Sequence, residues 1–495
     1  MAVDPRRIGD STAITTIGVT TADRPGALRR CLLSLSRQLR HQSHDVRIIV
    51  VDGSKRSTNE GLGRSIAQAI GTSTGCDIAF IGRRERRDIR RRLISICSGD
   101  LIDFIITPGA SGNRNIAILL SSGENVLLVD DDVVCEQWKV SSFRNAIEVS
   151  GHVERRDLGF FRTRRAARRG MDRVTASLLD AHGVLLGRSL ESLSTSKSPR
   201  VDATRACRFL VEGLAGLRSV VVRTTFSGLT GDAGASNPER LLFGTGKWKE
   251  LLLSSRDVYD TAFKYREVRR VADRYLVIHD VACMGFCMGL ANSSMAPPFL
   301  PTGRNEDGLF GMTLSAVDRT AVIGHIPYAV LHDSARASRY GQYAFVSATQ
   351  TRVADLMIHL VNAWTPSTRA ARPKQRLSRL AQWLGELADL DERDLATAIV
   401  ETVFKARERE LTSIDAALRP GSGYPEHWRR DLKRYRDTLV TNLHRPEFFV
   451  PIELSDDRSI RCGYARTREY LRMSSACLAA WPALWAEARS TVRIA

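Results

Sequence analysis

Short β-branched apolar runs alternate with segments of helical periodicity along the first part of the chain. Each run is long enough for one buried strand, and most are followed by polar turn residues. This alternation predicts an α/β fold with a Rossmann-like, mostly parallel sheet flanked by helices. The predicted strands are 14–20, 46–51, 77–81, 103–107 and 125–129, and the predicted helices include 27–35 and 113–122.

The pattern changes twice further along the chain. A basic, helix-like stretch at 139–190 precedes a strand at 219–226 and a glycine-rich segment at 227–238, which is expected to be a loop. From residue 343 onward, apolar residues follow helical spacing almost throughout. We therefore expect a tail at 1–13, an α/β domain at 14–345 with an insertion at about 139–225, and a mainly α-helical C-terminal domain at 346–495.

Candidate chemistry is concentrated where predicted strands end. The apolar run at 125–129 stops at Asp130, Asp131 and Asp132, and apolar residues resume directly afterwards. Three adjacent carboxylates repel one another unless a divalent cation or solvent offsets their charge. Asp130 and Asp132 project to the same side of an extended chain. The pattern therefore predicts a Mg²⁺ or Mn²⁺ site that holds a diphosphate.

Two further segment ends carry polar groups in an order that fits the same chemistry. Glu306 and Asp307 lie at an expected helix start, where the helix dipole favours carboxylates. One of them can take a proton from an attacking hydroxyl. His332 ends an apolar run and can complete the coordination of a metal ion. Taken singly, each feature is more often structural, either a charge at a helix start or a core histidine.

Composition limits the partners of the protein. The 495 residues include 73 Lys and Arg against 55 Asp and Glu, a net charge of +18, which suits a polyanion, an anionic membrane surface or a phosphorylated substrate. The densest arginine cluster, at 83–92, contains no aromatic residues, which argues against nucleic acid. No apolar stretch approaches the ~20 residues of a membrane span. The first residues lack the apolar core of a signal peptide. We expect a cytoplasmic protein, with peripheral membrane contact left open.

Several segments together resemble glycosyltransferase family 2, whose members have the GT-A fold. The resemblance covers roughly residues 14–335 and is most specific in its N-terminal half. It is carried by residues 19–25 (Val-Thr-Thr-Ala-Asp-Arg-Pro), 48–54 (Ile-Ile-Val-Val-Asp-Gly-Ser), 112–117 (Gly-Asn-Arg-Asn-Ile-Ala), 127–132 (Leu-Leu-Val-Asp-Asp-Asp), 305–307 (Asn-Glu-Asp) and His332.

The resemblance implies a metal-dependent, inverting transfer of sugar from a nucleotide-diphosphate sugar. UDP is the family's commonest donor nucleotide. Asp307 would be the general base, and Glu306 would support it or bind the acceptor. A Mn²⁺ or Mg²⁺ ion would be held by Asp130, Asp132 and His332. The nucleotide-sugar would be bound by Thr20, Thr21, Asp23, Arg24, Asp52, Arg114, Asp130 and Asp131.

Some alternatives stay open at this point. A nucleotidyltransferase also uses paired aspartates, but the turn at 21–26 has one glycine instead of a glycine-rich phosphate loop. A non-catalytic basic scaffold would explain the charge but not the ordered carboxylates. The spacer between Asp132 and Gly285 is longer than is usual in the family, and the family's acceptor-site tryptophan motif is not evident near Glu306. The acceptor, whether a glycan, lipid-linked group, peptide or small molecule, and the oligomeric state are not predicted.

Overall fold

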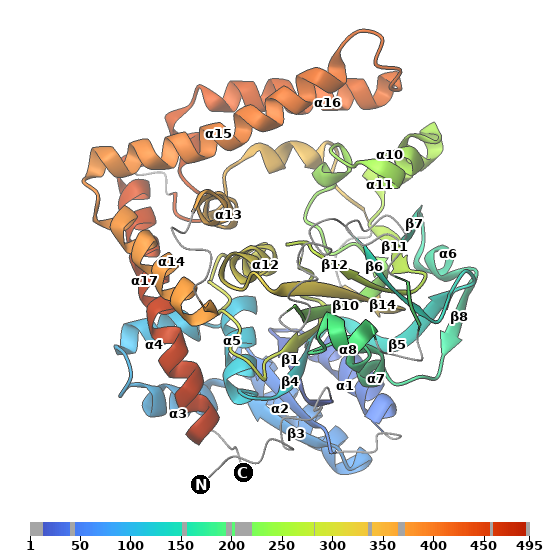
Figure 1. Ribbon diagram of the computed structural model, residues 1–495, viewed down its shortest axis with the longest axis vertical. Coiled ribbons are helices and arrows are strands. Elements are labelled where there is room, and N and C mark those ends of the chain that lie inside the picture. Colours follow the sequence, from blue (N-terminus) through green and yellow to red (C-terminus); the bar gives the residue numbers. More distant parts are fainter. Residues whose placement is uncertain are drawn as a thin grey trace.

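The computed structural model describes residues 13–39, 45–150, 156–194, 200–202, 220–281, 283–334, 339–364, 372–455 and 459–491. The predicted tail at 1–13 falls outside these residues except for residue 13, as does 203–219 within the predicted insertion. A mixed sheet forms the centre of the protein (Figure 1). Its central strands follow the order β3-β2-β1-β4-β13-β10-β14.

Six of these seven strands run in the same direction. β1 pairs in parallel with β2 and β4, and β2 pairs in parallel with β3. β13 is antiparallel to both β4 and β10, so β10 and its parallel partner β14 share the direction of β4. The strands are β1 (Ile14–Thr21), β2 (Arg47–Asp52), β3 (Asp77–Ile81), β4 (Asn125–Asp130), β10 (Val221–Asp232), β13 (Cys287–Ala291) and β14 (Ala321–His332).

Further strands extend the sheet beyond β10 and β14. β5, β12 and β8 add antiparallel pairings, β11 pairs with β10 and β7, and β6 and β9 pair in parallel beyond β12. These strands are β5 (Val133–Val140), β6 (Ala146–Ser150), β7 (Arg156–Phe161), β8 (Met171–Val174), β9 (Arg200–Asp202), β11 (Glu267–Ala272) and β12 (Tyr275–Ile278).

Helices cover both faces of the sheet, as the alternation of apolar residues requires. In β2, Ile48 and Val50 belong to one core and Ile49 and Val51 to the other. The first core includes α1 (Pro25–Leu39), α2 (Ser57–Thr74), α7 (Leu178–Gly183) and α8 (Leu190–Ser194). The second includes α3 (Arg83–Leu93), α4 (Gly99–Ile105), α5 (Ala110–Leu120) and α12 (Glu306–Val317). The predicted α/β class is confirmed.

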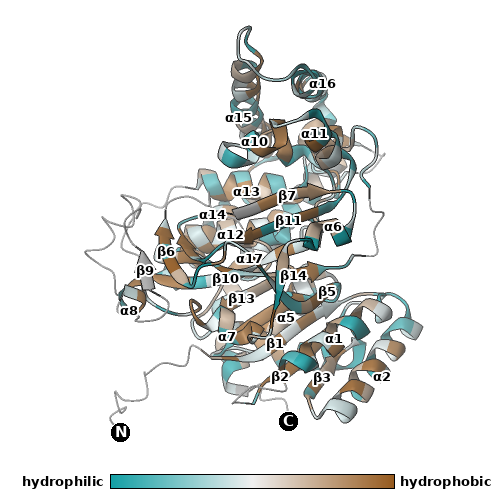
Figure 2. Ribbon diagram, turned by 90° about the vertical axis from the view of Figure 1, so that its right-hand side faces the viewer, coloured by the Kyte–Doolittle hydropathy of each residue, from teal (hydrophilic) through white to brown (hydrophobic). Residues whose placement is uncertain are grey.

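The C-terminal part is helical, as predicted. α17 lies beside α14 and reaches α4 and α5, while α15 and α16 form a pair at the far end of the molecule (Figures 1 and 2). Trp481 and Trp485 of α17 donate hydrogen bonds to the Ala296 carbonyl at 2.6 Å and to Asn292 Oδ1 at 2.9 Å. These tryptophans therefore fasten the helices to the α/β part. The helices are α13 (Val353–Ala363), α14 (Pro373–Asp389), α15 (Glu392–Leu418), α16 (Glu426–Leu443) and α17 (Ile460–Thr491).

Short helices join the remaining segments. They are α6 (Arg164–Arg168), η3 (Glu239–Leu241), α10 (Gly246–Leu253), α11 (Arg256–Lys264), η4 (Ala344–Thr349) and η5 (Pro446–Phe449). Across the part of the chain that the structure describes, none of the helices combines the length and apolar character needed to span a bilayer.

Three predicted elements are wrong. Residues 103–107 belong largely to α4, because Ser98 caps that helix through the Leu101 amide at 3.4 Å and Leu101, Ile102 and Ile105 form a buried helical face. The stretch 139–190 contains β6, β7 and β8 between short helices. Its strand signal is the two-residue spacing of buried Ile147 and Val149, which the many arginines obscured.

The glycine-rich segment is the third correction. β10 continues through Asp232, so only the residues after it form a loop. The glycines permit close approach of neighbouring strands. A Cβ on Gly228 would lie 2.7 Å from Val271 Cγ2, and one on Gly231 would lie 2.5 Å from the His332 carbonyl.

Candidate active site at the carboxyl ends of the central strands

The carboxyl ends of the parallel strands meet at one edge of the sheet. Thr21 lies opposite Asp52 in the β1–β2 pairing, and Thr20 lies opposite Asp130 in the β1–β4 pairing. β14 ends at His332 on the same edge, because it runs in the direction of β4. Open α/β sheets bind ligands at this edge. The fold thus assembles residues that are more than 300 positions apart in sequence.

The three consecutive aspartates have separate partners. Asp130 Oδ1 accepts a hydrogen bond from Thr20 Oγ1 at 2.9 Å. Asp131 Oδ2 accepts one from Thr21 Oγ1 at 2.6 Å. The Arg24 guanidinium bridges Asp131 and Asp132, with 2.7 Å to Asp131 Oδ1 and 2.6 Å to Asp132 Oδ2. The Arg24 guanidinium and the two threonine hydroxyls thus offset the repulsion among the three charges.

Asp132 also faces His332, whose Nε2 lies 3.2 Å from Asp132 Oδ1. Burial alone would raise the pKa of Asp132, but His332 and Arg24 outweigh it and hold this pKa well below its usual range. Burial opposes the charged form of His332, yet the Asp132 carboxylate raises its pKa to about 9. Asp131 differs, because burial raises its pKa to about 7 even against the attraction of Arg24. Asp132 is therefore the carboxylate that stays charged.

Arg114 of α5 connects the aspartates with the start of α12. Its Nη2 donates to Asp130 Oδ1 at 2.8 Å and its Nη1 to Glu306 Oε1 at 2.6 Å. The side chain is only 3% exposed, so both ion pairs are shielded from solvent. Burial disfavours the charged guanidinium, but Asp130 and Glu306 outweigh it and raise the pKa of Arg114. Arg114 is thus a fixed cation between two predicted site carboxylates.

Asp307 is held by backbone groups. Its Oδ2 accepts from the Gly285 amide at 2.9 Å, and the Gly285 carbonyl accepts from Arg114 Nη2 at 3.3 Å. The residue before α12, Asn305, has the left-handed backbone angle φ 59°. Non-glycine residues in this region are uncommon and are concentrated at functional sites. The turn at Asn305 sets the start of α12, where Glu306 and Asp307 lie.

Two predicted nucleotide-binding residues have structural partners. Asp23 has φ 55°, and its carboxylate accepts from the Lys55 and Arg56 amides at 3.1 and 3.2 Å, at the start of α2. Asn59 and these amides hold the pKa of Asp23 below its usual value. Asp52 Oδ1 accepts from the Ser54 amide at 2.7 Å, and burial raises its pKa. Both lie beside the aspartate cluster but do not contact it directly.

The predicted metal ligands meet only in part. Asp132 and His332 face each other, whereas Asp130 is taken up by Thr20 and Arg114. Within the described ranges, no three His, Cys, Asp or Glu side chains are grouped so as to hold a metal ion by themselves. Any ion at Asp132 and His332 would therefore need further oxygen ligands, from water or a bound substrate.

The Asp132–His332 pair fits such an ion. Asp132 Oδ1 is buried and, apart from its pairing with His332, has no hydrogen bond. Its 3.2 Å separation from His332 Nε2 matches neighbouring ligands of a six-coordinate ion with bonds of about 2.1 Å. His332 Nδ1 lies 2.8 Å from the Asp232 carbonyl oxygen, which fixes the ring and directs Nε2 toward Asp132.

Sequence reasoning missed the residues that fix His332 and Asp307. Asp232 contributes its carbonyl to His332, while its carboxylate makes a bidentate pair with Arg266 at 2.8 and 2.9 Å. Gly285 contributes its amide and carbonyl, and a Cβ there would lie 2.6 Å from Arg114 Nη2. Backbone groups leave no residue-type signal, so residue types alone did not indicate these contacts.

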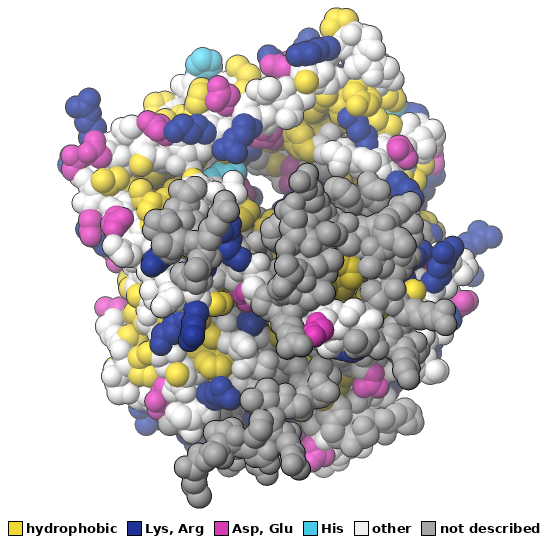
Figure 3. Space-filling model, viewed as in Figure 1, with side chains coloured by type: hydrophobic (Ala, Val, Ile, Leu, Met, Phe, Trp, Pro, Cys, Tyr) yellow, Lys and Arg dark blue, Asp and Glu magenta, His cyan; other side chains and the backbone are white. Residues whose placement is uncertain are grey.

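The distribution of surface charge bears on the alternative of a non-catalytic basic scaffold. Lys and Arg side chains are scattered over the visible face with acidic side chains among them (Figure 3).

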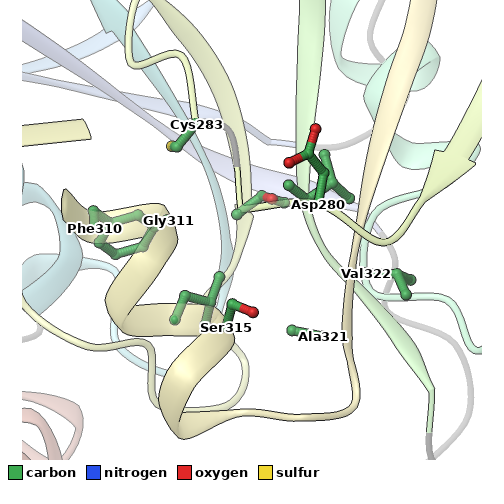
Figure 4. Close-up of a pocket in the computed structure, with 10 residues that line it drawn as sticks. Asp280, Cys283, Phe310, Gly311, Ser315, Ala321 and Val322 are labelled. Carbon is green, nitrogen blue, oxygen red and sulfur yellow. The ribbon is translucent and has the colours of Figure 1, made fainter. Parts of the chain in front are cut away.

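A separate small pocket lies between α12 and the sheet. Residues Asp280, Cys283, Phe310, Gly311 and Ser315 contribute to its lining, which includes none of the predicted site residues (Figure 4).

Comparison with known proteins gives matches among solved structures only. No protein-family model and no curated protein sequence matches the chain. The chain is similar to S. aureus TarS. TarS 1–349 in complex with UDP matches over 86% of this chain and 90% of that chain, with 14% identity and a TM-score of 0.33. The complex with UDP-GlcNAc matches over the same shares, with 13% identity and a TM-score of 0.33. Values at this level do not assign a function, so the assignment rests on the residues of this chain.

Proposed function

We propose that the protein is a glycosyltransferase that moves a sugar from a UDP-sugar to an acceptor with inversion at the anomeric carbon. One observation carries the proposal. Arg114 joins Asp130 at the end of β4 to Glu306 at the start of α12, next to Asp307, while Asp132 meets His332. A diphosphate site and a candidate base thus lie within one connected network, in the order that the resemblance to glycosyltransferase family 2 implies.

The donor would lie along the ends of β1, β2 and β4. Thr20, Thr21 and Asp52 lie at this edge and would contact the nucleoside. Asp132 and, after loss of its ring proton, His332 would hold a Mn²⁺ or Mg²⁺ ion, which would stabilise negative charge on the departing diphosphate. His332 is oriented for this by Asp232. Arg114 holds the Asp130 carboxylate in place.

Asp307 is the proposed general base. The Gly285 amide fixes one carboxylate oxygen, and the other accepts from the Gly308 amide at 2.9 Å. Both bonds orient the carboxylate at the helix start, where it can take the proton of an acceptor hydroxyl as that oxygen attacks. Burial raises the pKa of neighbouring Glu306, although Arg114 opposes the shift. Glu306 acts as the anchor of Arg114, and Asp307 as the proton acceptor.

The test is release of UDP from a panel of UDP-sugars, with and without candidate acceptors, by wild type and by Asp307→Asn. We expect the variant to lose transfer by at least about 100-fold while it still gains thermal stability from UDP. Glu401→Gln, an exposed change on α15, is the matched control and should retain activity. Retained transfer in Asp307→Asn would rule out the base role. Loss of UDP binding would instead make Asp307 a donor-binding residue.

A further inference from the structure

Arg24 occupies the place where the charge of a metal ion would otherwise be needed. Its guanidinium lies 2.7 Å from Asp131 Oδ1 and 2.6 Å from Asp132 Oδ2. We propose that Arg24 is an exchangeable counter-cation, which binds Asp131 and Asp132 in the ligand-free protein and passes to the donor diphosphate when a divalent cation takes Asp132. The inference rests on the proposed function and adds a coupling between metal and donor.

The backbone at Arg24 is fixed, while the side chain has room to move. The Arg24 carbonyl accepts from the Ala27 and Leu28 amides at 3.0 and 3.1 Å, in the first turn of α1. Asp23, immediately before it, is tied to the start of α2. The Arg24 side chain is nevertheless 42% exposed, against 0% for Asp131 and 8% for Asp132. A rotation of this side chain alone can therefore release the carboxylates.

Charge decides the direction of the exchange. A divalent cation at Asp132 and His332 would bring two positive charges next to a guanidinium that shares the same carboxylate, and like charges at this range repel strongly. Asp131 keeps its hydrogen bond from Thr21 when Arg24 leaves. The released guanidinium is a planar, bidentate donor, a geometry that matches diphosphate oxygens. Arg24 thus gains a new partner only if the nucleotide is present.

Two other cations of the site, Arg114 and His332, are already committed. Arg114 is 3% exposed and bound to two carboxylates, and His332 is fixed by the Asp232 carbonyl. Among the site cations described, Arg24 therefore has the most exposed side chain and contacts both Asp131 and Asp132. A metal ion that binds without nucleotide costs Arg24 its contact with Asp132 and gives it no diphosphate in exchange, so binding of metal and nucleotide should favour each other.

The experiment measures Mn²⁺ binding by electron paramagnetic resonance of the free ion, with and without UDP. It compares wild type, Arg24→Gln and the control Arg29→Gln, which changes another exposed arginine, in α1. We expect Arg24→Gln to bind Mn²⁺ about tenfold more tightly than wild type without UDP, and to show weaker coupling between Mn²⁺ and UDP. Arg29→Gln should match wild type. Adding Asp132→Asn to Arg24→Gln should abolish the gain.

The outcomes separate this inference from the proposed function. Unchanged or weaker Mn²⁺ binding by Arg24→Gln, while wild type still binds Mn²⁺ and UDP together, overturns only the exchange. A wild type in which Mn²⁺ and UDP do not bind together overturns both. Arg24→Lys keeps the charge but not the two-pronged guanidinium, and its Mn²⁺ affinity should lie between wild type and Arg24→Gln. Melting of each metal-free variant shows that the fold is kept.

Discussion

Two buried histidines, His182 in α7 and His332 at the end of β14, have opposite electrostatics. His182 is 0% exposed, with Nδ1 at 2.7 Å from Thr225 Oγ1 and Nε2 at 3.0 Å from Ser227 Oγ. His332 is 6% exposed and faces Asp132. Burial lowers the pKa of His182 to about 3, whereas the Asp132 carboxylate raises that of His332 to about 9. Both histidines are buried, so the charge of the partner decides whether the pKa falls or rises.

The largest expected effect is on transfer activity. It should distinguish the cluster of His332 and Asp132 from the cluster of His182 and Thr225. Asp132→Ala removes the carboxylate that faces His332 and should lower transfer by at least about 100-fold. Thr225→Val removes a partner of His182 and should leave transfer nearly unchanged. Rates of UDP release for the two variants at equal folded fraction check this. Equal losses in both would mean that the clusters do not differ in function.

The next effect concerns stability, and here the change at His182 should have the larger effect. His182→Ala should lower the free energy of unfolding by about 2–4 kcal/mol, because it opens a cavity and removes the partner of the buried Thr225 hydroxyl, while the Ser227 hydroxyl keeps Cys287 Sγ. His332→Gln should cost less, since its amide can still reach the Asp232 carbonyl and Asp132 keeps Arg24. Urea unfolding of both variants measures the difference. A larger loss for His332→Gln would contradict the structural assignment of His182.

The pH dependence of unfolding should sharpen the same contrast. The folded pKa of His182, about 3, lies below the ordinary 6.5, so its contribution is complete above pH 6.5 and is lost as the pH falls toward 3. The folded pKa of His332, about 9, lies above 6.5, so its contribution is complete below pH 6.5 and is lost as the pH rises through 9. Each group changes stability by at most about 1.4 kcal/mol per pH unit.

Unfolding of the metal-free protein across this pH range checks the two slopes. His182→Asn should flatten the acid side only, and His332→Gln the alkaline side only. A variant that alters the opposite side would show that its histidine titrates in the other direction.

The smallest expected effects come from two glycines of one segment. A Cβ on Gly285 would lie 2.6 Å from Arg114 Nη2, and one on Gly289 would lie 3.1 Å from His182 Nδ1 and closer still to Thr225 Oγ1. Gly285→Ala should therefore reduce transfer about tenfold with little loss of stability, and Gly289→Ala should reduce stability by about 1–3 kcal/mol with little loss of transfer. Rates and urea midpoints for the pair test this. Both alanines acting on the same property would break the comparison.

The fold was predictable where one face of each element is buried. The alternation of Ile48, Ile49, Val50 and Val51 between two cores is the signal of a buried strand. The same reasoning failed at 139–190, because arginines there mask the strand positions. It also failed at α4. The short apolar run there fits a strand as well as a helix until the Ser98 cap is recognised.

The site was predictable as a set of residues but not as a set of contacts. The sequence predicted that Asp132 and His332 act together, and the structure places them 3.2 Å apart. It gave no sign that Arg24 would pair with two aspartates or that Asp23 would hold the start of α2. Such contacts depend on where helices begin and how far long side chains reach, and neither follows from residue spacing.

The most direct test of the account is thermal stability with UDP, with and without Mn²⁺, for wild type and Asp132→Ala. A ligand that binds the folded protein raises its melting temperature by mass action. We predict that Mn²⁺ and UDP together stabilise wild type more than either does alone, and that Asp132→Ala loses this joint effect. Equal behaviour of the two proteins, or no response of wild type to UDP, would contradict a metal-assisted nucleotide-sugar site at Asp132 and His332.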